Sequence, residues 1–206
     1  MKVLDKSKCE LQYCKFTDIK HILKDYHYKG DSMGGGISIC FAMLLNNTLV
    51  GGSVLGKPRH ENVYVSHIDI RRMACVDESP KNSESWFLGQ IIDYIKRNTK
   101  YNAVLSYSDL TQGHDGTIYK ASNFKCIGKT SPTQHIEYKG KSYHMRSLTI
   151  ERPYSYEIRE AIKNNEAKII TGLPKIIWEY QIIRKGRKDK RVLKQFQKGG
   201  SQVKLF

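Results

Sequence analysis

The segment SYSDLTQGHDGTIYKASNF holds the densest group of side chains able to handle protons. These are Ser106, Tyr107, Ser108 and Asp109 at the end of an apolar run, His114 in the polar loop that follows, and Tyr119 behind that loop. Ligands of open α/β sheets bind at the carboxyl ends of strands. Carboxylate, imidazole and hydroxyl groups gathered there can orient a nucleophile and move its proton. The alternative is a simple strand-to-helix turn in which Asp109 or Asp115 caps the helix.

A second group of such side chains precedes a glycine-rich loop. His27 and Tyr28 follow Asp25, and three consecutive glycines end the loop at Gly36. Backbone amides in such a loop can approach a phosphate, but the loop can equally be a flexible lid. Because the segment lacks the GxxxxGK[ST] pattern, we do not predict a nucleotide site there.

A third group lies in the run IDIRRM, where Arg71 and Arg72 stand near the end of a predicted strand. Asn82, Ser85 and Trp86 follow at the predicted start of a helix. Guanidinium groups beside a helix start form a good anion site. The alternative is a pair of surface arginines matched to the acidic residues 77 and 78, with Trp86 in the core beside Phe87.

The charge balance is strongly positive. Thirty-five Lys and Arg residues stand against 20 Asp and Glu residues, which gives a net charge of +15. Such an excess favours a polyanionic partner, namely DNA, RNA or an acidic membrane. The basic C-terminal arm, residues 184–206, is predicted to contact phosphates through Arg184, Lys185, Arg187, Lys188, Lys190, Arg191 and Lys194. A solvated terminus is the alternative.

Several other classes of protein are disfavoured. The longest apolar run, Ile39–Leu45, is far shorter than the roughly 20 residues of a membrane span, and the N-terminus lacks the apolar stretch of a signal peptide. Five cysteines without a CxxC pair indicate thiols in a reducing cytoplasm. The histidines are scattered without ligand spacing, so we predict no metal site, although a metal requirement stays open.

The elements that must position these residues alternate between strands and helices. Strands are predicted over 9–16, 37–45, 49–55, 63–73, 102–109, 125–129 and 175–183, with a hairpin over 135–144. Helices are predicted from Thr17 to about 26, from Asn82 or Ser83 onward, and over 116–122 and 155–164. We therefore expect an α/β (α+β) fold with a mixed sheet flanked by helices. This order resembles the acyltransferase fold of the GNAT superfamily, here spanning residues 1–183.

The three groups together resemble the Mom family of phage DNA-modification proteins. The resemblance rests on HYKG (27–30), RRMACVDESPKNSESWF (71–87) and SYSDLTQGHDGTIYKASNF (106–124), and continues weakly into AKIITGLPKIIWEYQI (167–182). It implies a GNAT-like enzyme that converts adenine in DNA to its N6-carbamoylmethyl form, which protects the DNA from restriction. Double-stranded DNA is then the partner.

Two observations disfavour acetyl-CoA, the usual donor of acetyltransferases with this fold. The usual R/QxxGxG/A loop for CoA is replaced by RRMACVDESPKNSESW, which has no glycine. In the product the adenine nitrogen is bonded to a CH2, with a carboxamide beyond it. We infer transfer of an activated glycyl group followed by rearrangement through a five-membered spiro intermediate. The donor is left open between an aminoacyl-tRNA and acetyl-CoA, so tRNA is a further candidate partner.

The same resemblance assigns roles to the candidate residues. Asp109 or His27 accepts the proton of the attacking amine, and the hydroxyls of residues 106–108 bind either that base or the developing oxyanion. His114 and Tyr119 serve the leaving group. The two arginines hold a phosphate, and Tyr28 and Trp86 are candidates to stack on a flipped base.

Two other functions remain open at this stage. One is a CoA-dependent GNAT N-acetyltransferase of a protein or small amine, which the missing glycine loop disfavours. The other is a basic DNA-binding protein without catalysis, which the carboxylate at the polar strand end disfavours. The sequence leaves the oligomeric state and the target sequence undetermined.

Overall fold

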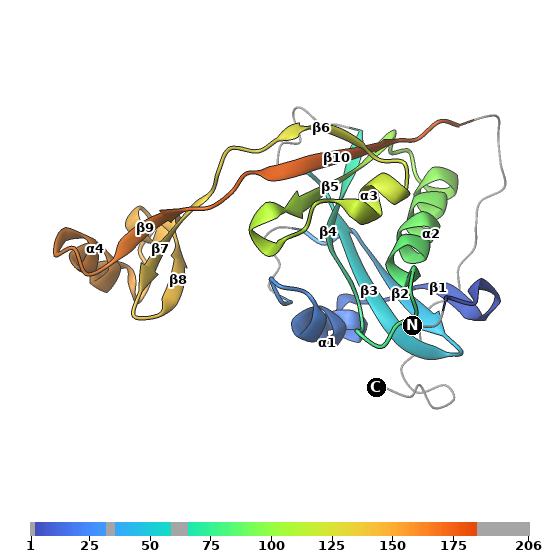
Figure 1. Cartoon of the computed structure of the whole chain (residues 1–206), viewed down its shortest axis with the longest axis horizontal. Helices are drawn as coiled ribbons and strands as arrows, with labels where there is room; N and C mark the ends of the chain where they lie inside the picture. The colour runs from blue at the N-terminus through green and yellow to red at the C-terminus, as the bar shows by residue number, and fades with distance from the viewer. Residues whose placement is uncertain (1–2, 32–35, 59–65, 185–206) are drawn as a thin grey trace. The chain divides into compact units, whose positions relative to one another are not determined.

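The computed structural model describes residues 3–31, 36–58 and 66–184 of the chain. Its largest feature is a seven-stranded sheet with the order β1-β2-β3-β4-β5-β10-β6 (Figure 1). These strands are β1 Cys9–Tyr13, β2 Ile39–Leu45, β3 Thr48–Gly56, β4 His67–Cys75, β5 Ala103–Asp109, β6 Lys125–Lys129 and β10 Lys175–Gln181. Strands β1 to β4 pair antiparallel and β5 joins β4 in parallel. The predicted mixed sheet is therefore confirmed.

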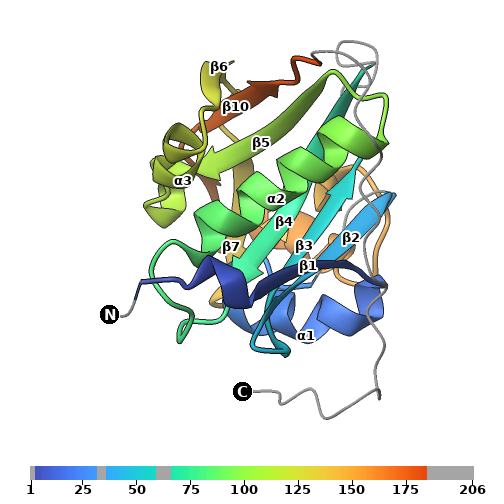
Figure 2. The ribbon, with the colours of Figure 1, turned by 90° about the vertical axis from the view of Figure 1, so that its right-hand side faces the viewer.

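Helices α1 (Phe16–Tyr26) and α2 (Ser83–Asn98) cover opposite faces of this sheet (Figure 1). Figure 2 looks onto the face that α2 covers. In α2, Phe87, Ile91 and Ile95 recur every fourth residue and are completely buried, as expected for one apolar stripe. On the other face, a Cβ added at Gly52 of β3 would lie 2.8 Å from the Cβ of Ile19 in α1. Gly52 therefore lets α1 pack directly against the sheet.

The start of α1 differs from the prediction. The helix was predicted to start at Thr17, but it begins one residue earlier, at Phe16, and Lys15 is its N-cap. The carboxylate of Asp18 accepts the backbone N–H of Lys15 at 2.9 Å. Asp18 thus supplies the capping side chain from the first turn, where the helix dipole also favours its charge.

Strand β4 has two irregularities beside the predicted site. In its pairing with β3, Val54 faces Arg72 and Leu55 faces Ile70, so Arg71 is the extra residue of a β-bulge. Its parallel pairing with β5 covers only His67–Asp69 against Ala103–Leu105. Both strands continue beyond these pairs, so β4 and β5 part after Asp69 and Leu105.

The segment between β6 and β10 forms a second, three-stranded sheet of order β8-β7-β9. Its elements are β7 Gln134–Tyr138, β8 Lys141–His144, β9 Lys168–Thr171, the 3-10 helix η3 Met145–Leu148 and helix α4 Ser155–Lys163. Ile136, Tyr138, Ile158 and Ala161 form its own buried core. The predicted hairpin and helix are confirmed here, whereas β9 was not predicted.

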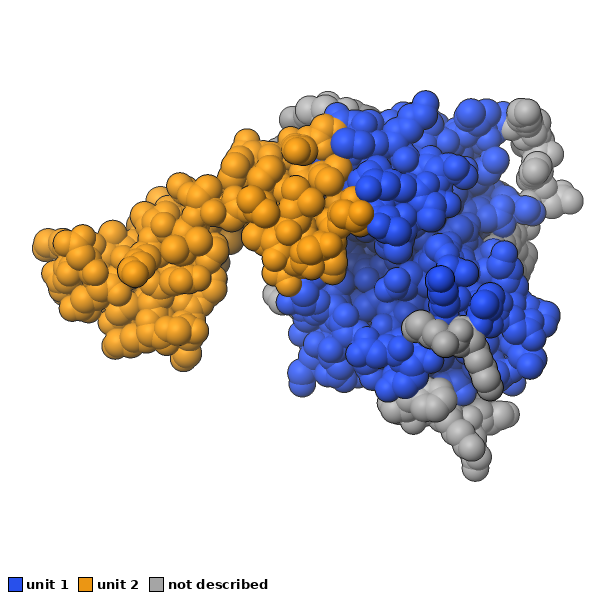
Figure 3. Space-filling model, viewed as in Figure 1, with its two compact units in different colours: residues 1–107, 116–127, 177–206 blue, residues 108–115, 128–176 orange. Residues whose placement is uncertain are grey.

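The contacts divide the chain into two compact units (Figure 3). Unit 1 contains residues 1–107, 116–127 and 177–206, and unit 2 contains residues 108–115 and 128–176. Strand β5 passes from unit 1 into unit 2 after Tyr107. Among the described residues, no helix combines the length and the apolar character needed to cross a membrane.

Candidate active site

A pair of hydroxyl groups lies in unit 1 next to the point where β4 and β5 part. The Oγ of Ser106, on β5, donates a hydrogen bond of 2.8 Å to the phenol oxygen of Tyr119. Tyr119 comes from the short helix α3 (Thr117–Ala121). Ser106 is almost fully buried, and Tyr119 is half-buried. Two of the predicted catalytic residues are therefore in direct contact, across 13 positions of sequence.

The surroundings of Tyr119 keep its phenol protonated. The pKa of Tyr119 is raised to about 12, and burial is the largest cause. The hydrogen bond from Ser106 lowers the pKa, whereas Asp69, Tyr28 and Glu84 contribute to raising it. A phenol with this pKa is a proton donor at neutral pH. Tyr119 can therefore protonate a leaving group but is a poor proton acceptor.

Aromatic packing fixes the position of α3. The Tyr119 ring stacks on Trp178 of β10, with ring centroids 5.9 Å apart, and meets Phe124 edge-on at 5.4 Å. Gly116, the N-cap of α3, has φ of +83° and lies against the Trp178 indole, where a Cβ would overlap the ring. A glycine is required there for both reasons, and it holds Tyr119 beside Ser106.

Asp109 is engaged in an ion pair inside unit 2. Its Oδ2 lies 2.5 Å from Nζ of Lys175, and only 8 % and 17 % of the two side chains are exposed. Its Oδ1 accepts hydrogen bonds from the backbone N–H and the hydroxyl of Thr111, so Asp109 caps the 3-10 helix η2 (Leu110–Gln112). The capping alternative is thus present in the structure, together with an ammonium partner that was not predicted.

The other predicted residues of this segment differ in exposure. Ser108 is buried, Tyr107 is half-buried and His114 is exposed. The backbone N–H of His114 donates to the carbonyl of Asp109 at 3.2 Å. His114 belongs to unit 2 and Tyr119 to unit 1.

The second predicted group follows α1. His27 is the C-cap of the helix, and its ring stacks on that of Tyr28 at 4.8 Å. The Nδ1 of His27 accepts the backbone N–H of Lys29 at 3.1 Å. The Tyr28 side chain remains 42 % exposed, which leaves an aromatic surface for a ligand. Residues 32–35, which include two of the three consecutive glycines, lie outside the described part.

The predicted arginines face α1 at the β-bulge. One Nη of Arg71 donates a hydrogen bond of 2.5 Å to the carbonyl of Lys57. A Cβ added at Gly56 would lie 2.5 Å from Nε of Arg71 and 2.5 Å from the carbonyl oxygen of Gly36. Gly56 therefore provides the space in which Arg71 meets the end of the glycine-rich loop. Arg72 donates to the carbonyl of Arg71, while the hydroxyl of Ser53 donates to the carbonyl of Arg72.

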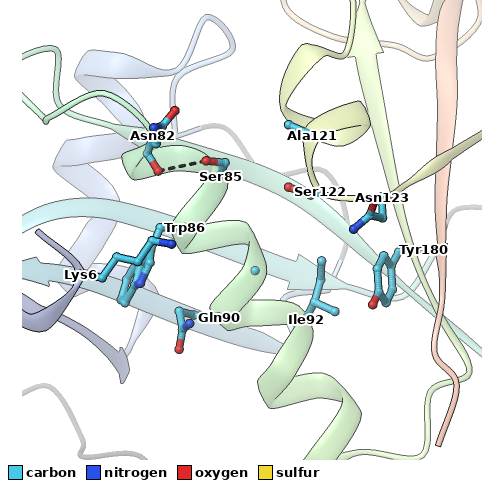
Figure 4. Close-up of a pocket in the computed structure, with 11 residues that line it drawn as sticks. Lys6, Asn82, Ser85, Trp86, Gln90, Ile92, Ala121, Ser122, Asn123 and Tyr180 are labelled. Atoms are coloured by element: carbon cyan, nitrogen blue, oxygen red, sulfur yellow. Dashed lines mark hydrogen bonds between the residues drawn. The ribbon is translucent and has the colours of Figure 1, made fainter. Parts of the chain in front are cut away.

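A pocket of about 470 Å3 contains Asn82, Ser85 and Trp86 of the third predicted group, but its two arginines do not line it (Figure 4). It is lined by Lys6, Asn82, Ser85, Trp86, Gly89, Gln90, Ile92, Ala121, Ser122, Asn123 and Tyr180, all in unit 1. Trp86 is half-buried in its wall, so the alternative that places it in the core is wrong. Two aromatic rings, side-chain amides and one ammonium group suit a ligand with a planar, hydrogen-bonding part.

Of the predicted arm, only Arg184 lies in the described part. Its guanidinium donates to the carbonyls of Thr99 and Tyr101 and to the side-chain oxygen of Asn102, at 2.6 to 3.1 Å. Arg184 therefore anchors the chain to the loop before β5. The other predicted contacts, residues 185–194, lie outside the described residues. Among residues 3–31, 36–58 and 66–184, no three His, Cys, Asp or Glu side chains are grouped to hold a metal ion.

Sequence reasoning did not single out two charged residues of this region. Asp69 is 6 % exposed and lies between the buried residues Ile68 and Ile70. A carboxylate within an apolar strand is a signal that the sequence did contain. Lys175 carried no such signal, because its link to Asp109 spans 66 positions and exists only in the folded chain.

Comparisons with solved structures show an acetyltransferase fold. The ribosomal-protein-S18-alanine N-acetyltransferase from Escherichia coli is 11 % identical, with a TM-score of 0.52 over 86 % of this chain and 96 % of its own. An N-acetyltransferase from Staphylococcus aureus is 13 % identical, with 0.53 over 85 % and 99 %. A Bacillus subtilis acetyltransferase in complex with CoA is 11 % identical, with 0.53 over 85 % and 100 %. The expected GNAT-like fold is confirmed.

Comparisons of sequence identify the family. No curated protein sequence matches the chain. Residues 8–197, by contrast, match the Mom protein family, and this range includes all three groups of candidate residues. The expected family is therefore confirmed, and the chain belongs to the Mom protein family.

Proposed function

We propose that this chain is a DNA-modifying transferase that converts adenine in double-stranded DNA to its N6-carbamoylmethyl form, as a phage defence against restriction. Membership of the Mom protein family supports DNA modification. The observation that carries the chemistry is the Ser106–Tyr119 pair, which lies beside the point where β4 and β5 part. A buried hydroxyl pair with a phenol that stays protonated suits the departure of an oxygen leaving group.

The reaction that fits the product begins with glycyl transfer. The adenine N6 attacks the carbonyl carbon of a glycyl ester, a C–N bond forms, and the C–O bond to the donor breaks. Tyr119 gives its proton to the departing oxygen, and Ser106 orients the phenol. The glycyl amine then attacks C6 of the adenine, and the original N6 leaves as the terminal carboxamide. The atoms balance without an oxidant or a metal.

The pocket beside α2 and α3 is the proposed site of the donor. Its rings, Trp86 and Tyr180, can stack on an adenine, which the 3′ end of an aminoacyl-tRNA and CoA share. The CoA pyrophosphate fits less well. The segment before α2 has no glycine to bring backbone amides close, and Glu84 places a negative charge in the first turn of that helix. We therefore favour the aminoacyl ester.

The acceptor adenine is proposed to enter from the α1 side. An adenine inside a duplex cannot reach a buried hydroxyl pair, so the base must be flipped out of the stack. Tyr28, exposed at the end of α1, can stack on the flipped base. Arg71 and Arg72 are the residues proposed to contact the DNA backbone beside it.

Nucleoside analysis of DNA from cells that express the chain tests this proposal. Digestion followed by mass spectrometry should reveal a deoxyadenosine heavier by a carbamoylmethyl group. Unmodified DNA from cells with abundant folded protein would refute the proposal. Acetyl transfer from acetyl-CoA to a protein or small amine, without DNA, would instead favour the CoA-dependent alternative.

A further inference from the structure

Asp69 is a buried carboxylate that the reaction described above does not yet use. It is 6 % exposed in the middle of β4, and its neighbours Ile68 and Ile70 are 0 % and 5 % exposed. Placing a carboxylate at such a position is costly compared with an apolar residue. A side chain held there despite this cost is a candidate for function.

The strand register fixes the face of the sheet on which Asp69 lies. Gly52 faces α1, and Gly56 shares its face because side chains alternate along a strand. Asp69 is the antiparallel partner of Gly56 and therefore also faces α1. Arg71 also lies over Gly56. Asp69 thus lies on the face proposed for the acceptor adenine.

The same register places the hydroxyl pair on the opposite face. Asp69 is the parallel partner of Leu105, and parallel partners point to the same side. Ser106, the next residue of β5, therefore points to the side of α3, where it meets Tyr119. The pairing of β4 with β5 ends at Asp69 and Leu105, so the two strands are no longer paired at Ser106.

The charge of Asp69 also influences the hydroxyl pair on the other face. The charge of Asp69 raises the pKa of the Tyr119 phenol, and among the causes that raise it only burial is larger. A carboxylate that favours the protonated phenol supports a division of roles between the two groups. One accepts a proton while the other retains a proton to donate.

We propose that Asp69 is the catalytic base that accepts the proton of the adenine amine as this amine attacks the donor carbonyl from the α1 side of the sheet. This inference rests on the proposed function. As the C–N bond forms, the proton of N6 passes to the Asp69 carboxylate. As the C–O bond of the donor breaks, its oxygen receives the proton of Tyr119 from the other face. The nucleophile and the leaving group are thus served from opposite sides of the sheet.

Asp109 is less suited to this role. Its Oδ2 contacts the ammonium of Lys175 and its Oδ1 accepts two bonds from Thr111. An ammonium at this distance stabilises the carboxylate over the acid, so protonation would break the ion pair. Asp109 therefore fits a structural role within unit 2.

The substitution Asp69→Asn tests the proposal, because asparagine keeps the shape but cannot accept the proton. We expect glycyl transfer to DNA to slow by about 10²–10⁴-fold, with unchanged DNA binding and melting temperature. Asp93→Asn is the matched control, since Asp93 pairs with Arg97 on the outer side of α2, and it should leave the rate unchanged. A folded Asp69→Asn protein with more than about a third of the wild-type rate would overturn the proposal.

If Asp69→Asn does not fold, Asp69→Glu gives a second test. It keeps the acid but moves it by one methylene, so a folded Asp69→Glu protein should lose rate by at least about tenfold. A wild-type rate in this variant would also overturn the role of Asp69. Failure of the proposed function is distinguishable, because the wild-type protein itself would then leave adenine unmodified.

Discussion

Units 1 and 2 differ in charge and in the polar contact that each makes with β5. Unit 1 carries 26 Lys and Arg against 13 Asp and Glu, whereas unit 2 carries 9 against 7. Unit 1 joins β5 to α3 through two neutral hydroxyls, and unit 2 joins the end of β5 to Lys175 through an ion pair. Neutral hydroxyls can pass protons at little cost, whereas a buried ion pair resists a change of charge. We therefore expect unit 1 to carry out the chemistry and to attract polyanions. The ion pair of unit 2 is expected to have a structural role.

Removal of the phenol oxygen of Tyr119 should have the largest effect. Tyr119→Phe keeps the ring stack with Trp178 but cannot donate a proton, so we expect adenine modification to slow by about 10²–10⁴-fold. The loss of one hydrogen bond should cost only about 1 kcal/mol of stability. The initial rate of modified nucleoside formation measures the effect. Since the phenol pKa is about 12, Tyr119 itself should cause no loss of rate up to about pH 10.

Tyr156→Phe is the matched control for this variant. Tyr156 is 69 % exposed in unit 2, so the loss of its hydroxyl should leave the rate unchanged. Equal rates for both variants would show that the hydroxyl pair of unit 1 is not part of the chemistry.

Neutralising the basic residues that follow Arg184 should weaken DNA binding for all sequences alike. Six of them, Lys185, Arg187, Lys188, Lys190, Arg191 and Lys194, would be replaced by glutamine while the anchor Arg184 is kept. Each phosphate contact contributes about 0.9 to the dependence of log affinity on log salt. We therefore expect the slope to fall by up to about 5 in binding titrations at several salt concentrations.

The control for this experiment, which removes five positive charges instead of six, lies in unit 2. Lys129, Lys139, Lys141, Lys163 and Lys168 are exposed there, and their replacement by glutamine should change the slope little. A larger change from these lysines than from the arm would reverse the comparison between the units.

Breaking the ion pair of unit 2 should affect stability more than chemistry. Asp109→Asn leaves the mostly buried ammonium of Lys175 without its carboxylate, which we expect to cost about 3 kcal/mol in urea unfolding. Adding Lys175→Met should recover part of this loss, and the double variant should still modify adenine. A stable double variant without activity would instead show that Asp109 is the base.

The exposed pair of Lys139 and Glu157 is the control within the same unit. Their side chains are 69 % and 55 % exposed at an N–O distance of 3.0 Å, so Glu157→Gln should leave the melting temperature almost unchanged. A similar loss of stability when either pair is broken would mean that burial does not determine how much the Asp109–Lys175 contact contributes to stability.

Much of the fold could be predicted because the patterns are local. The helix from Asn82 or Ser83 onward and the strands over 37–45 and 49–55 were predicted from such patterns and are present as α2, β2 and β3. The polar end of the strand over 102–109 predicted the segment that contains Ser106 and Tyr119. Each of these signals lies within about 20 residues of sequence. The motifs that resemble the Mom family are local in the same sense.

Only the tertiary structure decided which of these residues meet and on which face. The register of β3, β4 and β5 places Asp69 and Ser106 on opposite faces, and a single bulge at Arg71 sets how that arginine meets Gly56. Lys175, the partner of Asp109, is the first residue of β10 and lies 66 positions further along the chain. The sequence by itself determined which side chains can handle protons, because that is a property of residue type. Their pairing, burial and charge state depend on contacts between distant segments, which exist only once the sheet has formed.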